Sequence, residues 1–430
     1  MTIKFGVFRE DQKIDTDEAL RNQDNFANRK LLISEEALKD EIGHWFEYCK
    51  SVADIGIHYG VETFVAVHKD AKKSVLSELQ AKPVYVETSW DGMHVEPNTL
   101  QRYWGIVTHN WLVYRTMDKL LGELGAVDVI FAPTVTIHHV LGWRLLLAKN
   151  GGRRFNRLVL LFRNNAGYYD SGCEEPKFSR PAKILGLILR TYKKSLKCGM
   201  TEFATDSDRL AKEYLAISTV RPTVFPSPRV APRYVPIENA SLPTTCLKFC
   251  SLGPARFEKG IDILQEAVER ILEIEFTDIR VEFIIQWNSD ILSANGDVYY
   301  PSQSLMSDDR VTILTEALSS EDYLEVLSSS HCVLLPYRRD SYFSRISGVA
   351  VEAATAGKPM IYTKETWCEE FAVNFGAGIS VKDGSVESLV EAIQEMVLNF
   401  SNFSDEAFLR AEEAAKMHNP EEFMTKLWGV

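Results

Sequence analysis

The second half of the chain alternates short apolar runs with segments of helical spacing, and this alternation restricts the fold more than any other feature. The apolar runs are continuous rather than interrupted by polar residues, so both faces of each strand must be buried. Such strands, separated by helices, form a parallel sheet covered on both sides, which predicts a Rossmann-like domain. The expected strands are 246–252, 280–286, 310–315, 331–337, 358–363 and 376–381, and the expected helices are 259–274, 320–329, 347–356 and 385–399.

A proline-rich stretch, residues 221–243, separates this domain from the first half of the chain. It holds six of the sixteen prolines, and proline removes a backbone donor and fixes φ, so neither a helix nor a central strand is expected there. A chain of 430 residues also exceeds what one core usually serves. We therefore expect two domains, 1–220 and 244–404, joined by this linker and followed by a helical tail, 405–430, that packs back on the N-terminal domain.

The first half of the chain carries the same two kinds of segment in a less regular order. Strands are expected at 3–8, 62–68, 127–133, 157–163 and 200–206, and helices at 35–54, 100–124 and 208–216. This pattern again indicates α/β structure. The predicted fold class is therefore α/β, with two Rossmann-like domains facing a cleft.

Charge and cysteine content exclude some classes of protein. A formal net charge of −12 argues against a nucleic-acid binder, which would collect Lys and Arg. The seven cysteines form no C-x-x-C pair, as expected for reduced thiols in a cytoplasm. The sequence has neither a signal peptide nor a run of about 18 apolar residues. We therefore expect a cytoplasmic protein without a membrane span.

A motif suited to phosphate follows the first strand of the C-terminal domain, in SLGPARFEKGIDILQEA. Gly253 lets the chain turn at the strand end, Arg256 and Lys259 place two cations there, and Gly260 begins the helix. Ligands of parallel sheets bind beyond the carboxyl ends of the strands, where helix N-termini offer free N–H groups. The motif alone fits a diphosphate site and solvated charges around a turn equally well.

A second motif, LPYRRDSYFSRISGVAVEAATAGKPMI, strengthens the phosphate interpretation. Ser347 and Gly348 are expected to start a helix, and the free N–H groups of that end suit a phosphate. Glu352, one turn further along, is able to accept both hydroxyls of a ribose. The alternative for Glu352 is an acid stabilised near a helix N-terminus.

Together the two motifs resemble the donor half of retaining GT-B glycosyltransferases of the large family-4 type, over roughly residues 247–392. The shared pattern is GPAR-x-EKG-x-D-x-L, followed by R-x-SG-x-x-x-EA-x-x-x-GKP. The resemblance implies that Arg256 and Lys259 bind the diphosphate of a nucleotide sugar and promote its departure. It also implies that Glu352 binds the ribose. The complete set of binding residues that it implies is Gly253, Arg256, Lys259, Arg345, Ser347, Gly348 and Glu352.

Three positions bear on how far this resemblance extends. Family members commonly carry an E-x7-E pair, and Ser344 stands where the first glutamate is expected. A Gly-Gly loop after the first strand is also common, whereas here the segment KFGVFREDQK, residues 4–13, contains only Gly6. His138 and His139 lie just past a strand, where the family often has a histidine facing the donor sugar, so both are candidate catalytic residues. A loop imidazole without a catalytic role fits them equally well.

The resemblance implies transfer of a sugar, with retention, from a nucleoside-diphosphate sugar to a hydroxyl of a glycan or lipid-linked glycan. Cations and a helix N-terminus would stabilise the leaving diphosphate, so no metal and no further cofactor are expected. Two D-x-D triplets, Asp15/Asp17 and Asp206/Asp208, are metal-like in spacing, but the second precedes a helix and predicts an N-cap. The alternatives are a non-catalytic nucleotide-sugar binding protein and a GT-B-fold sugar-nucleotide epimerase.

Positive charge is concentrated in the N-terminal half, where residues 140–198 hold 13 Lys and Arg against 3 Asp and Glu, a balance of +10. Within this region, 182–197 has the pattern of a basic amphipathic helix. Such a helix can lie on an anionic membrane, which predicts peripheral attachment through residues 177–198. An ordinary helix packed on the sheet is the alternative. The cations on one side are Lys183, Arg190, Lys193, Lys194 and Lys197, and the apolar residues opposite are Ile184, Leu185, Ile188, Leu189, Tyr192 and Leu196.

Overall fold

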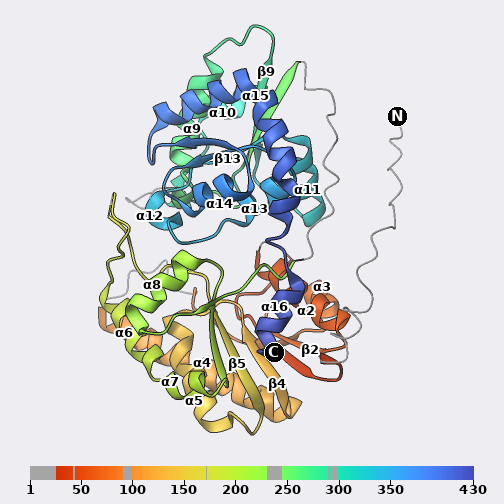
Figure 1. Ribbon diagram of the computed structural model, residues 1–430, viewed down its shortest axis with the longest axis vertical. Helices are drawn as coiled ribbons and strands as arrows, with labels where there is room; N and C mark the ends of the chain where they lie inside the picture. The colour runs from red at the N-terminus through yellow and green to blue at the C-terminus, as the bar shows by residue number, and fades with distance from the viewer. Residues whose placement is uncertain are drawn as a thin grey trace.

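The computed structural model describes residues 26–41, 44–90, 99–170, 172–229, 245–288, 291–292 and 298–430. Figure 1 shows two α/β domains, one above the other, with the N-terminal domain below. Each domain is built on a parallel sheet with helices on both faces, which confirms the predicted fold class. The expected first strand, residues 3–8, and the triplet Asp15/Asp17 lie outside the described residues.

The N-terminal sheet has seven parallel strands in the order β3-β2-β1-β4-β5-β6-β7. Neighbouring residues of a strand face opposite sides, so Leu32 joins one core while Leu31 and Ile33 join the other. Helices α4, α5, α6, α7 and α8 cover the first face, and α2, α3 and α16 cover the second. The strands are β1 (Lys30–Ser34), β2 (Glu62–His68), β3 (Lys82–Tyr85), β4 (Val127–Ala132), β5 (Phe155–Phe162), β6 (Thr201–Thr205) and β7 (Thr223–Val224). The helices are α2 (His44–His58), α3 (Lys73–Glu78), α4 (Thr99–Leu124), α5 (Ile137–Asn150), α6 (Arg180–Arg190), α7 (Lys193–Lys197), α8 (Asp208–Ser218) and α16 (Pro420–Trp428).

The C-terminal sheet has six parallel strands in the order β12-β9-β8-β13-β14-β15. Its strands coincide closely with the apolar runs of the sequence, because both of their faces are buried. The strands are β8 (Cys246–Ser251), β9 (Arg280–Gln286), β12 (Val311–Leu314), β13 (Cys332–Leu335), β14 (Met360–Thr363) and β15 (Gly378–Val381), with a short hairpin, β10 (Ile291–Leu292) and β11 (Val298–Tyr299). The helical elements are η1 (Phe257–Lys259), α9 (Ile261–Leu272), α10 (Gln303–Ser307), α11 (Ser320–Ser329), α12 (Arg339–Tyr342), α13 (Gly348–Thr355), α14 (Trp367–Phe375) and α15 (Val386–Ala415).

The chain passes between the domains at two places that lie side by side. β7 pairs with β6, so the first residues of the predicted linker belong to the N-terminal sheet; residues 230–243 lie outside the described residues. The second passage follows α15, which bends at Asn399 and includes the first part of the predicted tail. The backbone N–H of Ser227 donates to Met417 O (3.1 Å), and the N–H of Asn419 donates to Ser227 O (3.1 Å). After this crossing, α16 packs on the N-terminal domain.

Two predicted helices differ from the structure. The predicted helix 35–54 begins too early: Glu35 donates its N–H to Ala66 O (3.0 Å) as β1 ends, and α2 begins only at His44. The predicted basic helix 182–197 is divided into α6 and α7. Much of its apolar side belongs to the core, since Leu185, Leu189 and Tyr192 are buried. None of the described helices is both long enough and apolar enough to cross a membrane.

Candidate functional site

The loop from β8 to α9 requires glycine at two positions. Gly253 has φ +83°, and a Cβ on it would lie 2.5 Å from Lys259 Nζ. Gly260 has φ +69°, and a Cβ there would lie 2.0 Å from the carbonyl oxygen of Pro336. The N–H of Gly253 donates to Gln286 Oε1 (2.6 Å), which fixes the turn at the carboxyl end of the strand. Both glycines therefore hold the predicted cations close to the sheet.

Lys259 lies half-buried beneath this turn. Its Nζ donates to Leu252 O (3.3 Å) and lies 5.7 Å from the ring centroid of Tyr337. Burial, and then the charge of Arg256, lower the pKa of Lys259 to about 7. The ammonium is thus poorly compensated in this structure, and an anion placed next to it would restore its charge.

A single carboxylate is shared by the other two predicted cations of this region. Glu258 accepts from Arg256 Nη1 (3.3 Å) and from Arg345 Nη1 (3.2 Å). Glu258 thus pairs with two of the three cations, whereas Lys259 is attracted to Glu258 and Glu352 without an ion pair; the Arg256 side chain is half exposed. Such a positive excess at the carboxyl edge of a parallel sheet is suited to a bound anion.

The N-terminus of α13 adds backbone donors to this edge. Ser347 is the N-cap, and its Oγ accepts the N–H of Ala350 (3.2 Å). The space beside Gly348 is open, because a Cβ built there meets nothing within 4 Å. A hollow of about 430 Å³ lies nearby, between the domains, and is lined by Tyr169, Phe257, Glu258, residues 338–341 and Asp383. Glu258, the partner of Arg256 and Arg345, connects the predicted phosphate residues to this hollow.

Glu352 already has protein partners on both of its carboxylate oxygens. Oε1 pairs with the guanidinium of Arg229, at the end of the described part of the linker, and Oε2 accepts from the hydroxyl of Tyr323 (2.5 Å). The prediction from sequence missed both partners. Each oxygen keeps one further acceptor site, so a ribose at Glu352 would share the carboxylate with Arg229 and Tyr323 or replace one of them.

Ser344, the position of the absent family glutamate, is completely buried between the domains. Its Oγ lies 2.8 Å from the hydroxyl of Tyr169 and donates to Glu213 Oε1 (3.3 Å), and its carbonyl accepts from Ser207 Oγ (2.5 Å). Arg209 adds an interdomain ion pair with Glu370 (2.5 Å). In this structure the position serves the contact between the domains.

The two predicted histidines lie in different surroundings on the first turn of α5. His139 is buried: its Nδ1 accepts the N–H of Thr136 (3.0 Å), and its Nε2 lies 2.9 Å from Glu36 Oε1. His138 is half exposed. Burial, and then the imidazoles of His139 and His109, lower the pKa of His138 to about 4, so its ring is neutral at physiological pH. His138 alone of the pair retains surface for a ligand.

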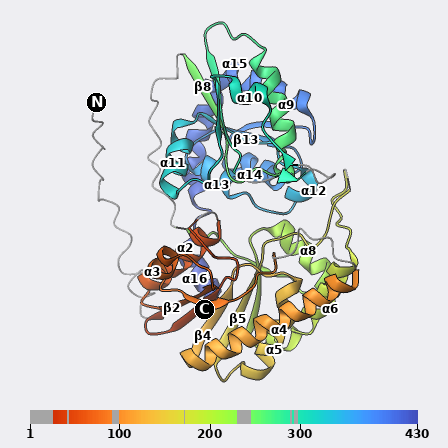
Figure 2. The ribbon, with the colours of Figure 1, turned by 180° about the vertical axis from the view of Figure 1, so that it is seen from behind.

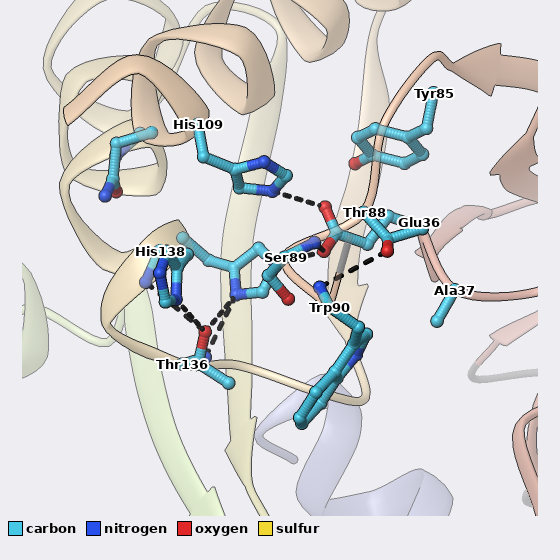
Figure 3. Close-up of polar contacts among 12 residues, drawn as sticks. Glu36, Ala37, Tyr85, Thr88, Ser89, Trp90, His109, Thr136 and His138 are labelled. Carbon is cyan, nitrogen blue, oxygen red and sulfur yellow. Dashed lines mark hydrogen bonds and ion pairs between the residues drawn. The ribbon is translucent and has the colours of Figure 1, made fainter. Parts of the chain in front are cut away.

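Glu36 is the centre of a buried cluster that the sequence did not reveal (Figure 3). Its Oε2 bonds to His109 Nε2 (2.7 Å), and its Oε1 accepts the N–H of Ser89 (2.6 Å) as well as facing His139. Burial alone would raise the pKa of Glu36, but the two imidazoles hold it well below its usual range. The cluster ties the end of β1 to the loop after β3 and to helices α4 and α5.

Two imidazoles and a carboxylate are also a donor set that zinc or iron accepts. The tautomer of His139 opposes this interpretation. Because the N–H of Thr136 donates to Nδ1, the proton of the neutral ring is on Nε2, directed at Glu36. A metal at Nε2 would move that proton to Nδ1, which would lose the bond from the Thr136 N–H and would have to donate to Thr136 Oγ1 (3.0 Å) instead. The geometry therefore favours a hydrogen-bonded cluster.

Glu35, next to Glu36, is shifted in the opposite direction. Burial raises its pKa to about 7, and among the described residues its Oε2 has no hydrogen-bond partner. Its Oε1 accepts the N–H of Ala37 (3.1 Å). Two neighbouring carboxyls thus differ in charge at neutral pH because only Glu36 has cationic or N–H partners on both oxygens.

The described triplet Asp206/Asp208 shows no shared metal position. Asp206 pairs with Arg163 (3.2 Å), whereas Asp208 pairs with Lys212 (3.0 Å) on the opposite side of the helix start. The N-cap of α8 is Ser207, whose Oγ accepts from Leu210 N (3.1 Å). The expected capping function therefore belongs to the residue between the two carboxylates.

Residues 237–408 match the family model of glycosyl transferases group 1. No curated protein matches the sequence. Among solved structures, sucrose-phosphate synthase from Thermosynechococcus elongatus is similar with 15% identity and a TM-score of 0.63, over 94% of this chain and 98% of that one. Anabaena HepE in complex with UDP and glucose is similar with 15% identity and a TM-score of 0.61, over 93% and 98% of the chains.

UDP-GlcNAc 2-epimerase from Neisseria meningitidis, bound to UDP-GlcNAc, is similar with 13% identity and a TM-score of 0.54, over 93% of this chain and 99% of that one. Identities this low show the fold alone. Taken together, they show that the chain has the GT-B fold, and the match to the family model of glycosyl transferases group 1 is confined to residues 237–408.

Proposed function

We propose that the protein is a retaining glycosyltransferase that moves a hexosyl or related sugar from a nucleoside-diphosphate sugar to a hydroxyl acceptor without a metal. The observation that carries the proposal is the cluster of Arg256, Arg345 and Lys259 beside the open N-terminus of α13, in which Glu258 pairs with the two arginines and Lys259 has no ion pair. This convergence lies inside the part of the chain that matches group 1 glycosyltransferases.

The proposed chemistry concerns the negative charge that builds on the leaving diphosphate. Arg256 and Lys259 stabilise that charge as cations, and the N–H groups at Ser347 and Gly348 add fixed dipoles. A diphosphate next to Lys259 favours the ammonium form of this lysine, so Lys259 takes up a proton when the diphosphate binds. The role commonly filled by a metal is thus assigned to side chains and a helix end.

The roles of the remaining predicted residues follow from their surroundings. Glu352 binds the ribose through the acceptor sites that Arg229 and Tyr323 leave on its two oxygens. His138 faces the donor sugar, while His139 holds the first turn of α5 against Glu36. Retention without a carboxylate at Ser344 fits a reaction in which the leaving phosphate itself directs the incoming hydroxyl on the same face.

The proposed acceptor is a glycan or a lipid-linked glycan used in polysaccharide synthesis, at the cytoplasmic face of a membrane. A sugar-nucleotide epimerase is the main competitor, since the Neisseria epimerase shares the fold and also binds a nucleotide sugar. A nucleotide-sugar binding protein without catalysis is the third candidate.

One experiment separates these functions. Nucleotide sugars are screened by thermal shift, starting with UDP-glucose and UDP-GlcNAc, and release of UDP is then measured with and without glycan acceptors. A transferase releases UDP in an acceptor-dependent manner and gives a product whose anomeric configuration, seen by NMR, equals that of the donor. Conversion of the donor to its 2-epimer without an acceptor would replace the proposal with the epimerase. Binding without turnover of any donor would replace it with the binding protein.

A further inference from the structure

The outward side of four helices, α4, α5, α6 and α7, forms a continuous surface that we call the α4–α7 face. α4 packs along α5, and α5 along α6, all over one face of the N-terminal sheet. Figure 2 shows α4, α5 and α6 running next to one another along the lower domain. The opposite face of this sheet is covered by α2, α3 and α16, so the α4–α7 face is an outer surface of the protein.

Large apolar side chains are exposed on three of these helices. Trp104 and Trp111 of α4, two turns apart on the same side, are 69% and 52% exposed, and Leu187 of α6 is 60% exposed. Tryptophan side chains are usually buried for most of their area. Other exposed apolar side chains of the same helices are Val107, Leu141, Leu145 and Ile184.

The same four helices are rich in cations. The four helices together contain eleven Lys and Arg against two acids, in a protein whose net charge is −12. Both acids already lie next to a lysine: Asp118 pairs with Lys149 (2.8 Å), and Glu123 lies 3.9 Å from Lys119. The exposed cations without an acidic partner among the described residues are Arg115, Arg180, Lys183, Arg190, Lys193, Lys194 and Lys197.

An open hollow between α4 and α5 combines both features. It is lined by Trp111, Tyr114, Arg115, Thr116, Asp118, Lys119 and Lys149, and Asp118 pairs with Lys149 (2.8 Å). Arg115 lies 5.9 Å from the Trp111 ring centroid, and Lys149 lies 5.7 Å from the Tyr114 ring centroid. Cations held next to aromatic rings at an apolar surface suit an anionic headgroup whose acyl chains contact the same rings.

We propose that the α4–α7 face binds an anionic lipid bilayer, with Trp104, Trp111 and Leu187 inserted at the level of the headgroups. A nucleic acid would neutralise the lysines but would leave the aliphatic side chains in water. An anionic bilayer satisfies both, because apolar groups enter its interface while lysines remain among the phosphates. This proposal replaces the continuous amphipathic helix expected at 182–197, whose apolar side is largely buried, with a surface that includes α4.

The α4–α7 face lies close to the N-terminal side of the candidate site, so a membrane bound there would be near the cleft. α4 presents Trp104 outward and, on its inner side, places His109 against Glu36. α5 begins with His138 at the same edge of the sheet. A bilayer on this face would therefore lie next to the N-terminal side of the cleft and bring a membrane-borne acceptor to it. This last step rests on the proposed function, whereas lipid binding does not.

Vesicle flotation of the full chain tests the proposal. The wild type should float with phosphatidylcholine vesicles that contain 30% phosphatidylglycerol at low salt, and should remain at the bottom with phosphatidylcholine alone. Each nearby cation contributes roughly fivefold to partitioning, so the variant K183E/K193E/K194E should lose most of the binding. The variant W104A/W111A should partition to the anionic vesicles at least tenfold more weakly than the wild type, even at low salt. It keeps every cation and loses only the apolar contact with the bilayer.

The matched control is L398A/L409A, which removes two side chains, 79% and 80% exposed, from α15 of the other domain. It should float like the wild type. If the wild type stays at the bottom with anionic vesicles, or if W104A/W111A floats like the control, the proposal fails. Binding of a homopolymeric RNA in place of vesicles would assign the face to nucleic acid and likewise overturn it. Thermal shift with UDP, measured on the same variants, tests the donor site separately.

Discussion

The two edges that face each other across the cleft are built on opposite electrostatic plans. On the C-terminal edge, Arg256 and Arg345 share the carboxylate of Glu258, and Lys259, which has no ion pair, is left with a depressed pKa of about 7. On the N-terminal edge, Glu36 has every oxygen bonded within the protein. An edge with unsatisfied charge is suited to a ligand, whereas an edge with satisfied charge contributes to the fold. Substitutions should therefore affect binding at one edge and stability at the other.

The largest effect should come from R256A/K259A. The variant removes two charge-assisted contacts to a diphosphate, and we expect the affinity for UDP or GDP to fall about 100-fold by titration calorimetry. The free energy of unfolding should barely change, because burial already disfavours the Lys259 ammonium. R270A, which removes an exposed arginine of α9, is the control and should keep its affinity. Unchanged nucleotide affinity in R256A/K259A would show that the C-terminal edge does not bind the diphosphate.

Next in size is the loss of stability expected for E36A. Removing this carboxylate leaves His109, His139 and the Ser89 N–H without their buried partner, which costs about 2–3 kcal/mol in urea denaturation. Because the pKa of Glu36 is lowered, its contribution is present above pH 4.5 and lost as the pH falls below it.

UDP affinity of E36A should stay within twofold of the wild type. The control, E62A, removes one side of an exposed pair with Lys30 and should cost far less stability. An E36A protein that is as stable as E62A would contradict a structural role for the N-terminal edge.

A smaller effect is expected from E352Q, since Glu352 combines the features of both edges. Losing the charge should weaken binding of UDP about tenfold, which is the value of one charged hydrogen bond. Binding of 2′-deoxy-UDP should be weaker than that of UDP in the wild type and about equal to it in the variant. If the wild type binds both nucleotides equally, Glu352 does not contact the ribose. Its role is then structural, through its bonds to Arg229 and Tyr323.

The smallest expected effect is a pH dependence of the donor edge. With a pKa of about 7, Lys259 is half protonated at pH 7 and roughly one-tenth protonated at pH 8, so UDP affinity should fall about fivefold over that interval. Proton uptake on binding should appear as a buffer-dependent enthalpy in calorimetry. K259R, which stays charged, should flatten the profile. A flat profile in the wild type would remove Lys259 from the diphosphate site.

The same contrast explains what the sequence predicted. The C-terminal edge is local: Gly253, Arg256 and Lys259 lie within seven residues, and their spacing alone indicates a phosphate site. The N-terminal edge depends on distant pairs, since Glu36 is 73 residues from His109 in sequence. The only local sign of the N-terminal edge was the apolar run KLLIS, which precedes Glu35 and Glu36 and is a strand in the structure. The two acids, followed by Ala and Leu, favour a helix by propensity, and a helix was predicted there. Tertiary contacts override that propensity.

The pattern at 182–197 illustrates a second limit. Apolar residues at helical spacing look alike whether they face a membrane or a core. Here Leu185, Leu189 and Tyr192 pack into the sheet's core, and the hydroxyl of Tyr192 donates to Val140 O (2.6 Å). Only the structure separates these side chains from exposed Leu187. Arg229 and Tyr323 could not be predicted either, because their contacts with Glu352 join separate segments.

Because α16 packs on the N-terminal domain, it determines the order in which the two domains can finish folding. Phe423, Met424, Leu427 and Trp428 fill the core beneath β4, against residues such as Phe131 and Phe225. During translation the N-terminal domain emerges first, yet this wall of its core is synthesised only after the entire C-terminal domain. The first domain to leave the ribosome is therefore the last to close, and its uncovered face must be shielded meanwhile, which makes it the expected point of engagement for chaperones.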